Sequence, residues 1–114
     1  MIPEISVEEL ANKLRSQDRF ILLDVRESWE LDQAAIRDER LEVAPMSRLA
    51  DEGTQSLPAG AHRKDAEIYT LCHHGVRSAD VTRWLTSQGW TRVFSVAGGI
   101  DAYARRIDPS VGMY

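Results

Sequence analysis

The sequence alternates short apolar runs with segments of helical periodicity, and this alternation constrains the fold more than any other feature. The run Phe20–Leu23 is apolar at every position, which is typical of a strand buried on both faces of a parallel sheet. Further strands are expected at Ile5 and over 41–44, 68–71 and 93–96. The alternation predicts an α/β fold with a parallel sheet of about five strands and helices on both faces.

The expected helices lie between these strands. Ser6 and Glu9 have the spacing of a capping box, and the apolar stripe behind them predicts a helix that runs to about Arg15. Ser78 is expected to cap a second helix that ends near Gly89. A weaker helical signal lies at 27–35, and the signals within 46–64 are mixed and suggest a short helix ahead of a long surface loop. A last helical stripe lies at 100–107.

Length and charge narrow the class of protein. A chain of 114 residues suits one domain, so a single domain over 1–114 is expected. The formal net charge of −4 argues against nucleic-acid binding, because neutralising phosphates requires a basic face. The apolar runs fall far short of the roughly 20 residues that span a bilayer, and the N-terminus lacks a signal-peptide pattern. A cytoplasmic protein with no membrane partner is therefore expected.

Cys72 is the single cysteine of the chain. An internal disulfide, a Cys-x-x-Cys redox pair and a multi-cysteine zinc site are therefore excluded, and any resolving thiol must come from another molecule. His73 and His74 lie too close to Cys72 in sequence to share a metal with it, and no fourth ligand is evident. No metal is expected.

Three residues lie just after the end of a predicted strand: Asp24, Cys72 and Gly98. Ligand sites of parallel sheets lie beyond the carboxyl ends of the strands, so these residues are expected to share one rim. Asp24 is expected to bond backbone N–H groups at its strand end. Arg26 has two possible roles: pairing with a carboxylate, or reaching the rim as a substrate-binding residue.

The segment from Cys72 to Ser78 carries the strongest chemical signal. It joins a strand to a helix, where free N–H groups and the positive end of the helix dipole face the thiol. Gly75 permits a backbone conformation closed to other residues, and Arg77 adds a positive charge that does not titrate. Each feature favours thiolate over thiol, which predicts an activated nucleophile rather than a buried structural cysteine.

This loop resembles the active-site loop of single-domain rhodaneses, which are sulfurtransferases. The similarity continues along the chain in three further motifs: Leu23-Asp24-Val25-Arg26-Glu27 with Trp29-Glu30, Ala97-Gly98-Gly99-Ile100-Asp101-Ala102-Tyr103, and the opening Ile5-Ser6-Val7-Glu8-Glu9-Leu10. The tail 107–110 resembles rhodanese domains fused to adenylyltransferases of molybdopterin and thiamine synthesis. Residues 35–40 depart from the family's His-Ile-Pro-Gly-Ala stretch, so a different connection is expected there.

The resemblance implies a two-step sulfur transfer through Cys72. The cysteine would attack the outer sulfur of a donor, hold it as a persulfide and pass it to an acceptor. Loop N–H groups would hold the persulfide, and Arg77 would hold an anionic donor such as thiosulfate. No cofactor is implied. The expected substrate-binding residues are His73, His74, Gly75, Val76, Arg77, Ser78 and Arg26.

The length of the cysteine loop distinguishes sulfur transfer from the reactions of related enzymes. Four residues lie between Cys72 and Arg77, whereas rhodanese-like phosphatases and arsenate reductases carry five, which favours sulfur over phosphate or arsenate. The candidate donors are thiosulfate, the persulfide of a cysteine desulfurase and, least favoured, mercaptopyruvate; the acceptor is a thiol or cyanide. Two alternatives stay open: a sulfur relay that serves a desulfurase or a sulfur-carrier protein, and a non-catalytic rhodanese-like interaction module.

Overall fold

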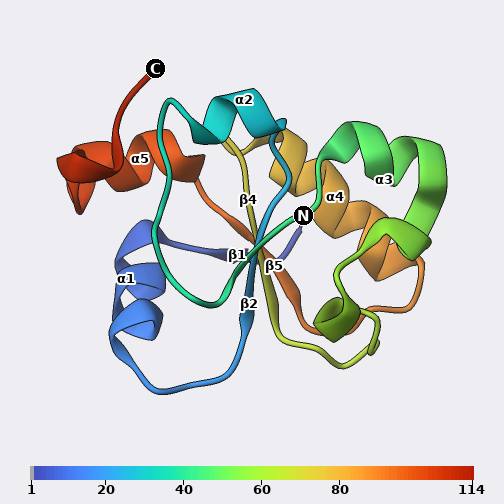
Figure 1. Cartoon of the computed structure of the whole chain (residues 1–114). Coiled ribbons are helices and arrows are strands. Elements are labelled where there is room, and N and C mark those ends of the chain that lie inside the picture. The colour runs from blue at the N-terminus through green and yellow to red at the C-terminus, as the bar shows by residue number, and fades with distance from the viewer. Residues whose placement is uncertain (1) are drawn as a thin grey trace.

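The computed structural model describes residues 2–114 and contains a parallel sheet of five strands (Figure 1). The strand order is β1-β5-β4-β2-β3, and each neighbouring pair is parallel. The predicted α/β fold is therefore confirmed. The strands are β1 (Glu4–Ile5), β2 (Ile21–Asp24), β3 (Leu41–Val43), β4 (Ile68–Leu71) and β5 (Val93–Val96).

Helices cover both faces of the sheet. In Figure 1, α1 and α5 lie together on one side of the strands, and α3 and α4 lie on the other. None of the helices within residues 2–114 is long and apolar enough to cross a membrane. The α-helices are α1 (Val7–Arg15), α2 (Ser28–Leu31), α3 (Met46–Glu52), α4 (Val76–Ser87) and α5 (Gly99–Arg106), and the short 3-10 helices are η1 (Gly53–Ser56), η2 (Ala59–Ala61) and η3 (Pro109–Val111).

The two faces of the sheet carry two separate hydrophobic cores. Leu22 of β2 packs in the core that includes Leu10 of α1 and Ile100 of α5. Its neighbour Leu23 points to the other face and packs in the core that includes Leu85 of α4. Both leucines are fully buried, because successive side chains of a strand point to opposite faces. Burial on both faces explains the unbroken apolar run in this strand.

The N-terminus of α1 has the predicted capping box. The backbone N–H of Glu9 donates to the Ser6 hydroxyl at 3.0 Å, and the N–H of Ser6 donates to the Glu9 carboxylate at 3.0 Å. Two of the N–H groups that a helix start leaves without partners are thereby satisfied. The helix ends at Arg15, as expected.

The helix predicted over 27–35 is shorter in the structure. It spans Ser28–Leu31, and the chain after it is captured by the C-terminal segment, since the N–H of Ala35 donates to the carbonyl of Val111 at 2.9 Å. A contact between residues so distant in sequence competes with the next helical turn. The helix predicted over 27–35 exists, but its predicted end at residue 35 was wrong for this reason.

The register of the sheet places the candidate residues on one edge. Asp24 pairs with Leu71 across β2 and β4, so Asp24 and Cys72 leave the sheet side by side. Ser95 of β5 pairs with Thr70 of β4, which brings the Gly98 turn to the same edge. The expected common rim at the carboxyl ends of the strands is confirmed.

Candidate functional site

Cys72 lies at the end of β4 with its sulfur held by the loop that follows. Its side chain is 1% exposed. The sulfur accepts the backbone N–H of Gly75 at 3.1 Å and that of Ser78 at 3.3 Å. Two N–H donors therefore point at the atom that would carry negative charge, as a thiolate nucleophile requires.

The sulfur also takes the place of the helix cap. Helix α4 begins at Val76, and its N-cap residue is Gly75, whose φ of 102° belongs to the left-handed region. Ser78 lies within the first turn, so the prediction that it caps the helix was wrong. A hydroxyl cap normally accepts an N–H of the second or third helical residue, and here the sulfur of Cys72 accepts that of Ser78.

A buried hydroxyl pair lies behind the sulfur. The Cys72 thiol donates to the Ser78 hydroxyl at 3.4 Å, and Ser78 shares a hydrogen bond of 2.7 Å with Ser95. Ser78 also donates to the carbonyl of Gly75 at 3.3 Å. All of these groups are buried or nearly so, and the pairing satisfies hydroxyls that would otherwise cost free energy. Ser78 therefore holds the Cys72 sulfur from inside the protein.

The start of α5 docks directly on the cysteine loop. The N–H of Ile100 donates to the carbonyl of Cys72 at 2.9 Å, and that of Asp101 donates to the carbonyl of His73 at 3.0 Å. Gly99 lies against both carbonyls, and its φ is +63°. A side chain there would collide with the loop backbone. The Gly-Gly turn is thus architectural.

Arg77 is held by an acidic partner from α2. Its guanidinium donates two hydrogen bonds to the carboxylate of Glu30, at 2.7 and 2.8 Å. The side chain of Glu30 is 5% exposed, and Arg77 lowers the pKa of this carboxyl from 4.5 to about 2. The positive charge of the loop is therefore compensated within the protein. This partner of Arg77 was not foreseen from the sequence.

Arg26 lies inside the protein rather than on the rim. It is fully buried and donates two side-chain hydrogen bonds to Asp24, at 2.9 and 2.7 Å. Asp24 also accepts the backbone N–H of Arg26 at 3.1 Å, as expected for a carboxylate at a strand end. Of the two roles considered for Arg26, the structure places it in the carboxylate pair. Substrate contact through this side chain is not supported, because no part of it is exposed.

Tyr114 brings the C-terminal segment onto the site, a contact that the sequence analysis did not anticipate. Its hydroxyl accepts from Arg26 at 3.1 Å and donates to Glu30 at 2.9 Å. Its ring stacks on the ring of His73, with centroids 3.7 Å apart and planes 6° from parallel. One side chain thus joins the buried arginine, the acidic partner of Arg77 and the residue next to Cys72.

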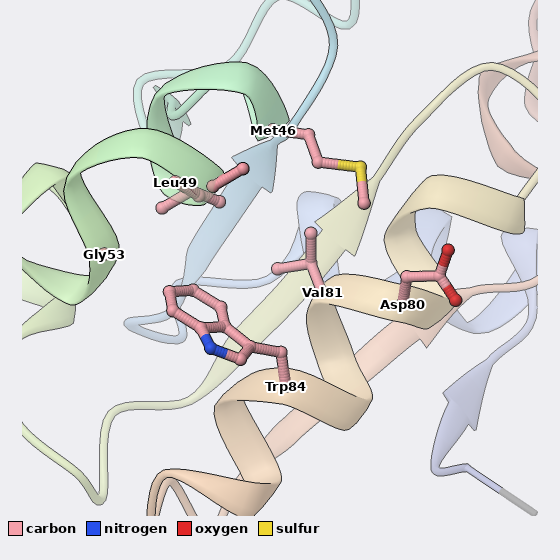
Figure 2. A pocket seen from close by; sticks show the side chains of 7 residues that line it. Met46, Leu49, Gly53, Asp80, Val81 and Trp84 are labelled. Atoms are coloured by element: carbon pink, nitrogen blue, oxygen red, sulfur yellow. The ribbon is translucent and has the colours of Figure 1, made fainter.

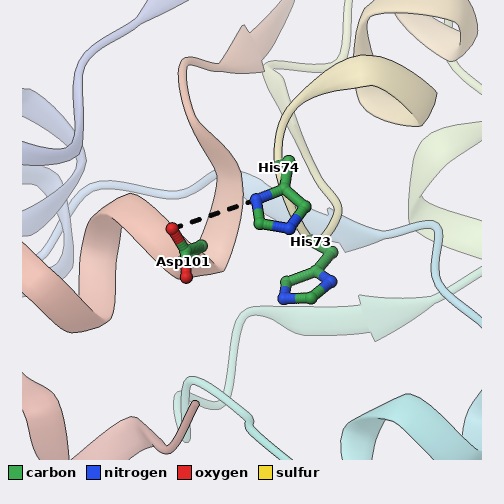
Figure 3. Close-up of side chains that lie close together, drawn as sticks. All are labelled: His73, His74 and Asp101. Atoms are coloured by element: carbon green, nitrogen blue, oxygen red, sulfur yellow. Dashed lines mark ion pairs between the residues drawn. The ribbon is translucent and has the colours of Figure 1, made fainter. Parts of the chain in front are cut away.

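His73 and His74 form a small cluster with Asp101 beside the loop (Figure 3). Their rings stack at 3.9 Å, and the Nδ1 of His74 lies 3.9 Å from a carboxylate oxygen of Asp101. The ligand atoms of the three residues lie within 4.8 Å of one another, so they could hold a divalent cation. Burial, helped by His74, lowers the pKa of His73.

The surface near the loop carries exposed apolar side chains. Val76, the first residue of α4, is 71% exposed, and Trp29 of α2 is 61% exposed. Trp29 meets Tyr114 edge to face, with ring centroids 6.4 Å apart. Val76 was expected to bind substrate, and its position leaves it open to a molecule that approaches the loop.

An apolar groove lies elsewhere, between α3 and α4 (Figure 2). It encloses about 390 Å³, and in Figure 2 Val81 and Trp84 of α4 face Met46 and Leu49 of α3. Its lining residues come from 46–53 and 80–84, outside the cysteine loop. The groove is therefore separate from the cysteine loop.

Comparisons with known proteins agree with this geometry. The sequence profile of the Rhodanese-like domain matches residues 6–106. The chain is 33% identical to a protein named "Sulfurtransferase" from Allochromatium vinosum, over 97% of this chain and 96% of that protein. It is 34% identical to "Rhodanese-like/PpiC domain-containing protein 12, chloroplastic" from Arabidopsis thaliana, of which it spans 38%. A solved "Rhodanese-like Domain Protein from Staphylococcus aureus" superposes with a TM-score of 0.74 and 29% identity, covering 90% of this chain and 91% of that one.

Proposed function

The chain belongs to the rhodanese-like domain family, and from that premise we propose that it is a sulfurtransferase that carries sulfur as a persulfide on Cys72. The observation that carries the proposal is the pair of backbone N–H groups, from Gly75 and Ser78, that point at the sulfur. The relative named "Sulfurtransferase" supports the same activity.

The proposed reaction has two steps, and both occur at the Cys72 sulfur. First, the thiolate attacks the outer sulfur of a donor, forming a new S–S bond, while the bond between that sulfur and the leaving group breaks. The leaving group, sulfite from thiosulfate or a thiolate from a persulfide, takes the electron pair. An acceptor thiol or cyanide then attacks the outer sulfur, and the Cys72 thiolate is restored.

The loop backbone suits a charge that moves from one sulfur to the next. Dipoles that are already oriented need not reorganise when the charge develops. The docking of α5 on the carbonyls of Cys72 and His73 keeps the loop in place. The remaining loop residues, His74, Gly75 and Val76, are proposed to form the walls against which the donor lies.

A protein-to-protein sulfur relay is a second candidate function. Cys72 is 1% exposed, while Val76 at the start of the next helix is 71% exposed and apolar. An exposed apolar side chain beside a recessed sulfur suits a partner that docks and presents its own persulfide. A cysteine desulfurase and a sulfur-carrier protein are the proposed partners. The expected cytoplasmic location stays a prediction.

Intact mass spectrometry tests the proposed function. The protein is incubated with thiosulfate or with a desulfurase and cysteine, desalted, and then treated with cyanide. We expect the wild type to gain one sulfur atom from at least one donor and to lose it to cyanide. Cys72→Ala should gain none, and Ser87→Ala, an exposed residue at the end of α4, should behave as the wild type. No sulfur gain from any donor would refute the proposal.

A further inference from the structure

Donors of sulfane sulfur differ in the charge that they bring to Cys72. Thiosulfate is a dianion, so its reaction with the thiolate gathers three negative charges around one sulfur. A protonated persulfide, R–S–SH, is neutral at the reacting end, so only the thiolate's own charge is present. A site that accelerates the first reaction needs uncompensated positive charge close to the sulfur, because like charges repel strongly at short range. The reaction with a persulfide needs no positive charge beyond the groups that stabilise the thiolate.

The positive side chains around the loop are already paired. Arg77 donates two hydrogen bonds to Glu30, and Arg26 donates two to Asp24. On the other side of the loop, Asp101 accepts from Arg105 at 3.0 Å. What holds the sulfur directly is a pair of backbone N–H groups, which suits a single negative charge.

From this charge balance we infer that Glu30 is a specificity-determining residue, which holds Arg77 in a neutral ion pair and thereby favours persulfide donors over thiosulfate. The inference rests on the proposed sulfurtransferase function. Glu30 is well placed for this role, because both of its oxygens bond to Arg77 while its side chain is only 5% exposed. Arg77 keeps 33% exposure, so its guanidinium borders solvent and would meet a donor if it were released.

Tyr114 acts through Glu30 and is a positioning residue. Its hydroxyl donates to the same carboxylate oxygen that accepts one of the Arg77 bonds. It also accepts from Arg26, so the hydroxyl bridges the guanidinium of Arg26 and the carboxylate of Glu30. Loss of the hydroxyl leaves Glu30 freer to turn away from Arg77. The stacking of the ring on His73 does not depend on the hydroxyl, so Tyr114→Phe separates the two contributions.

The test compares two donors in the same variants. Sulfur loading of Cys72 is followed by intact mass spectrometry, which gives a second-order rate constant for each donor. The readout is the rate constant with thiosulfate divided by the rate constant with glutathione persulfide. We expect the wild-type ratio to lie below one. Glu30→Gln keeps the shape and the bond from Tyr114 but removes the charge, and should raise the ratio about tenfold. Tyr114→Phe should raise it about two- to threefold. Glu52→Gln, an exposed carboxylate on α3 that pairs with Arg48, is the matched control and should leave it unchanged.

The outcomes separate the inference from the function on which it rests. A folded Glu30→Gln with an unchanged ratio, or a wild type that prefers thiosulfate, would overturn the role of Glu30. If Glu30→Gln does not fold, Tyr114→Phe decides, and an unchanged ratio there overturns the inference. Failure of both donors to load the wild type would instead refute sulfur transfer itself. A merely structural role for Glu30 would slow both donors together and leave their ratio constant.

Discussion

Replacing Gly99 by alanine tests how tightly α5 is docked on the cysteine loop. Gly99 has φ of +63°, and an added Cβ would collide with the backbone carbonyls of Cys72 and His73. Gly53, with a similar φ of +70°, has no atom within 4 Å of the position of an added Cβ, so it serves as a matched control. Both substitutions force alanine to a positive φ, which costs about 1–3 kcal/mol. The ψ of Gly53 is −158°, in a region that essentially only glycine adopts, so the control carries this backbone cost in full.

The difference between the two variants isolates the steric contact. Backbone atoms cannot move aside as a flexible side chain can, so the collision at Gly99 should add about 3 kcal/mol, at the upper end for overpacked sites. For a domain of this size, 1 kcal/mol corresponds to about 4 °C in Tm. Gly99→Ala should therefore melt below Gly53→Ala by up to about 12 °C, measured by circular dichroism at one scan rate. Equal melting temperatures would refute the close docking of α5 on the loop.

Two further predictions concern the buried charges. Arg26→Met should destabilise the protein by about 3–5 kcal/mol in urea unfolding, because the carboxylate of Asp24 is left buried without a charged partner. Adding Asp24→Leu should recover much of that loss, and a double variant no more stable than the single one would contradict this. The Glu30 ion pair contributes stability above the carboxyl's ordinary pKa of 4.5, and that contribution falls away as the pH drops through about 2. The wild type and Glu30→Gln should therefore differ in free energy of unfolding by about 2 kcal/mol less at pH 3 than at pH 6. A difference that does not change with pH would show that the ion pair does not couple the protonation of Glu30 to stability.

The fold could be predicted from the sequence because its signals are local. The apolar run ending at Leu23 and the capping box of Ser6 and Glu9 each specify one element without reference to distant residues. The common rim of the site could also be predicted, because Asp24 and Cys72 come directly after strands and the carboxyl ends of parallel strands lie at one edge of the sheet. These features depend on spacing of a few residues, which a single sequence displays.

The internal pairing of the site could not be predicted in the same way. Glu30 and Arg77 are 47 positions apart, and Glu30 and Tyr114 are 84 apart, so their contacts arise only when the chain has folded. Glu30 was visible merely as the continuation of the motif around Arg26. The cap of α4 was misread for a related reason: a hydroxyl was expected, and the sulfur of Cys72 serves instead.

The central claim is that Cys72 carries a transferable sulfur, and transfer from the loaded protein tests it most directly. The protein is loaded with labelled sulfur, freed of donor, and mixed with cyanide, and the thiocyanate formed is counted per chain. We expect about one labelled thiocyanate per wild-type chain and none from Cys72→Ser. Label that stays on the wild type, or an equal yield from Cys72→Ser, would contradict the proposed mechanism.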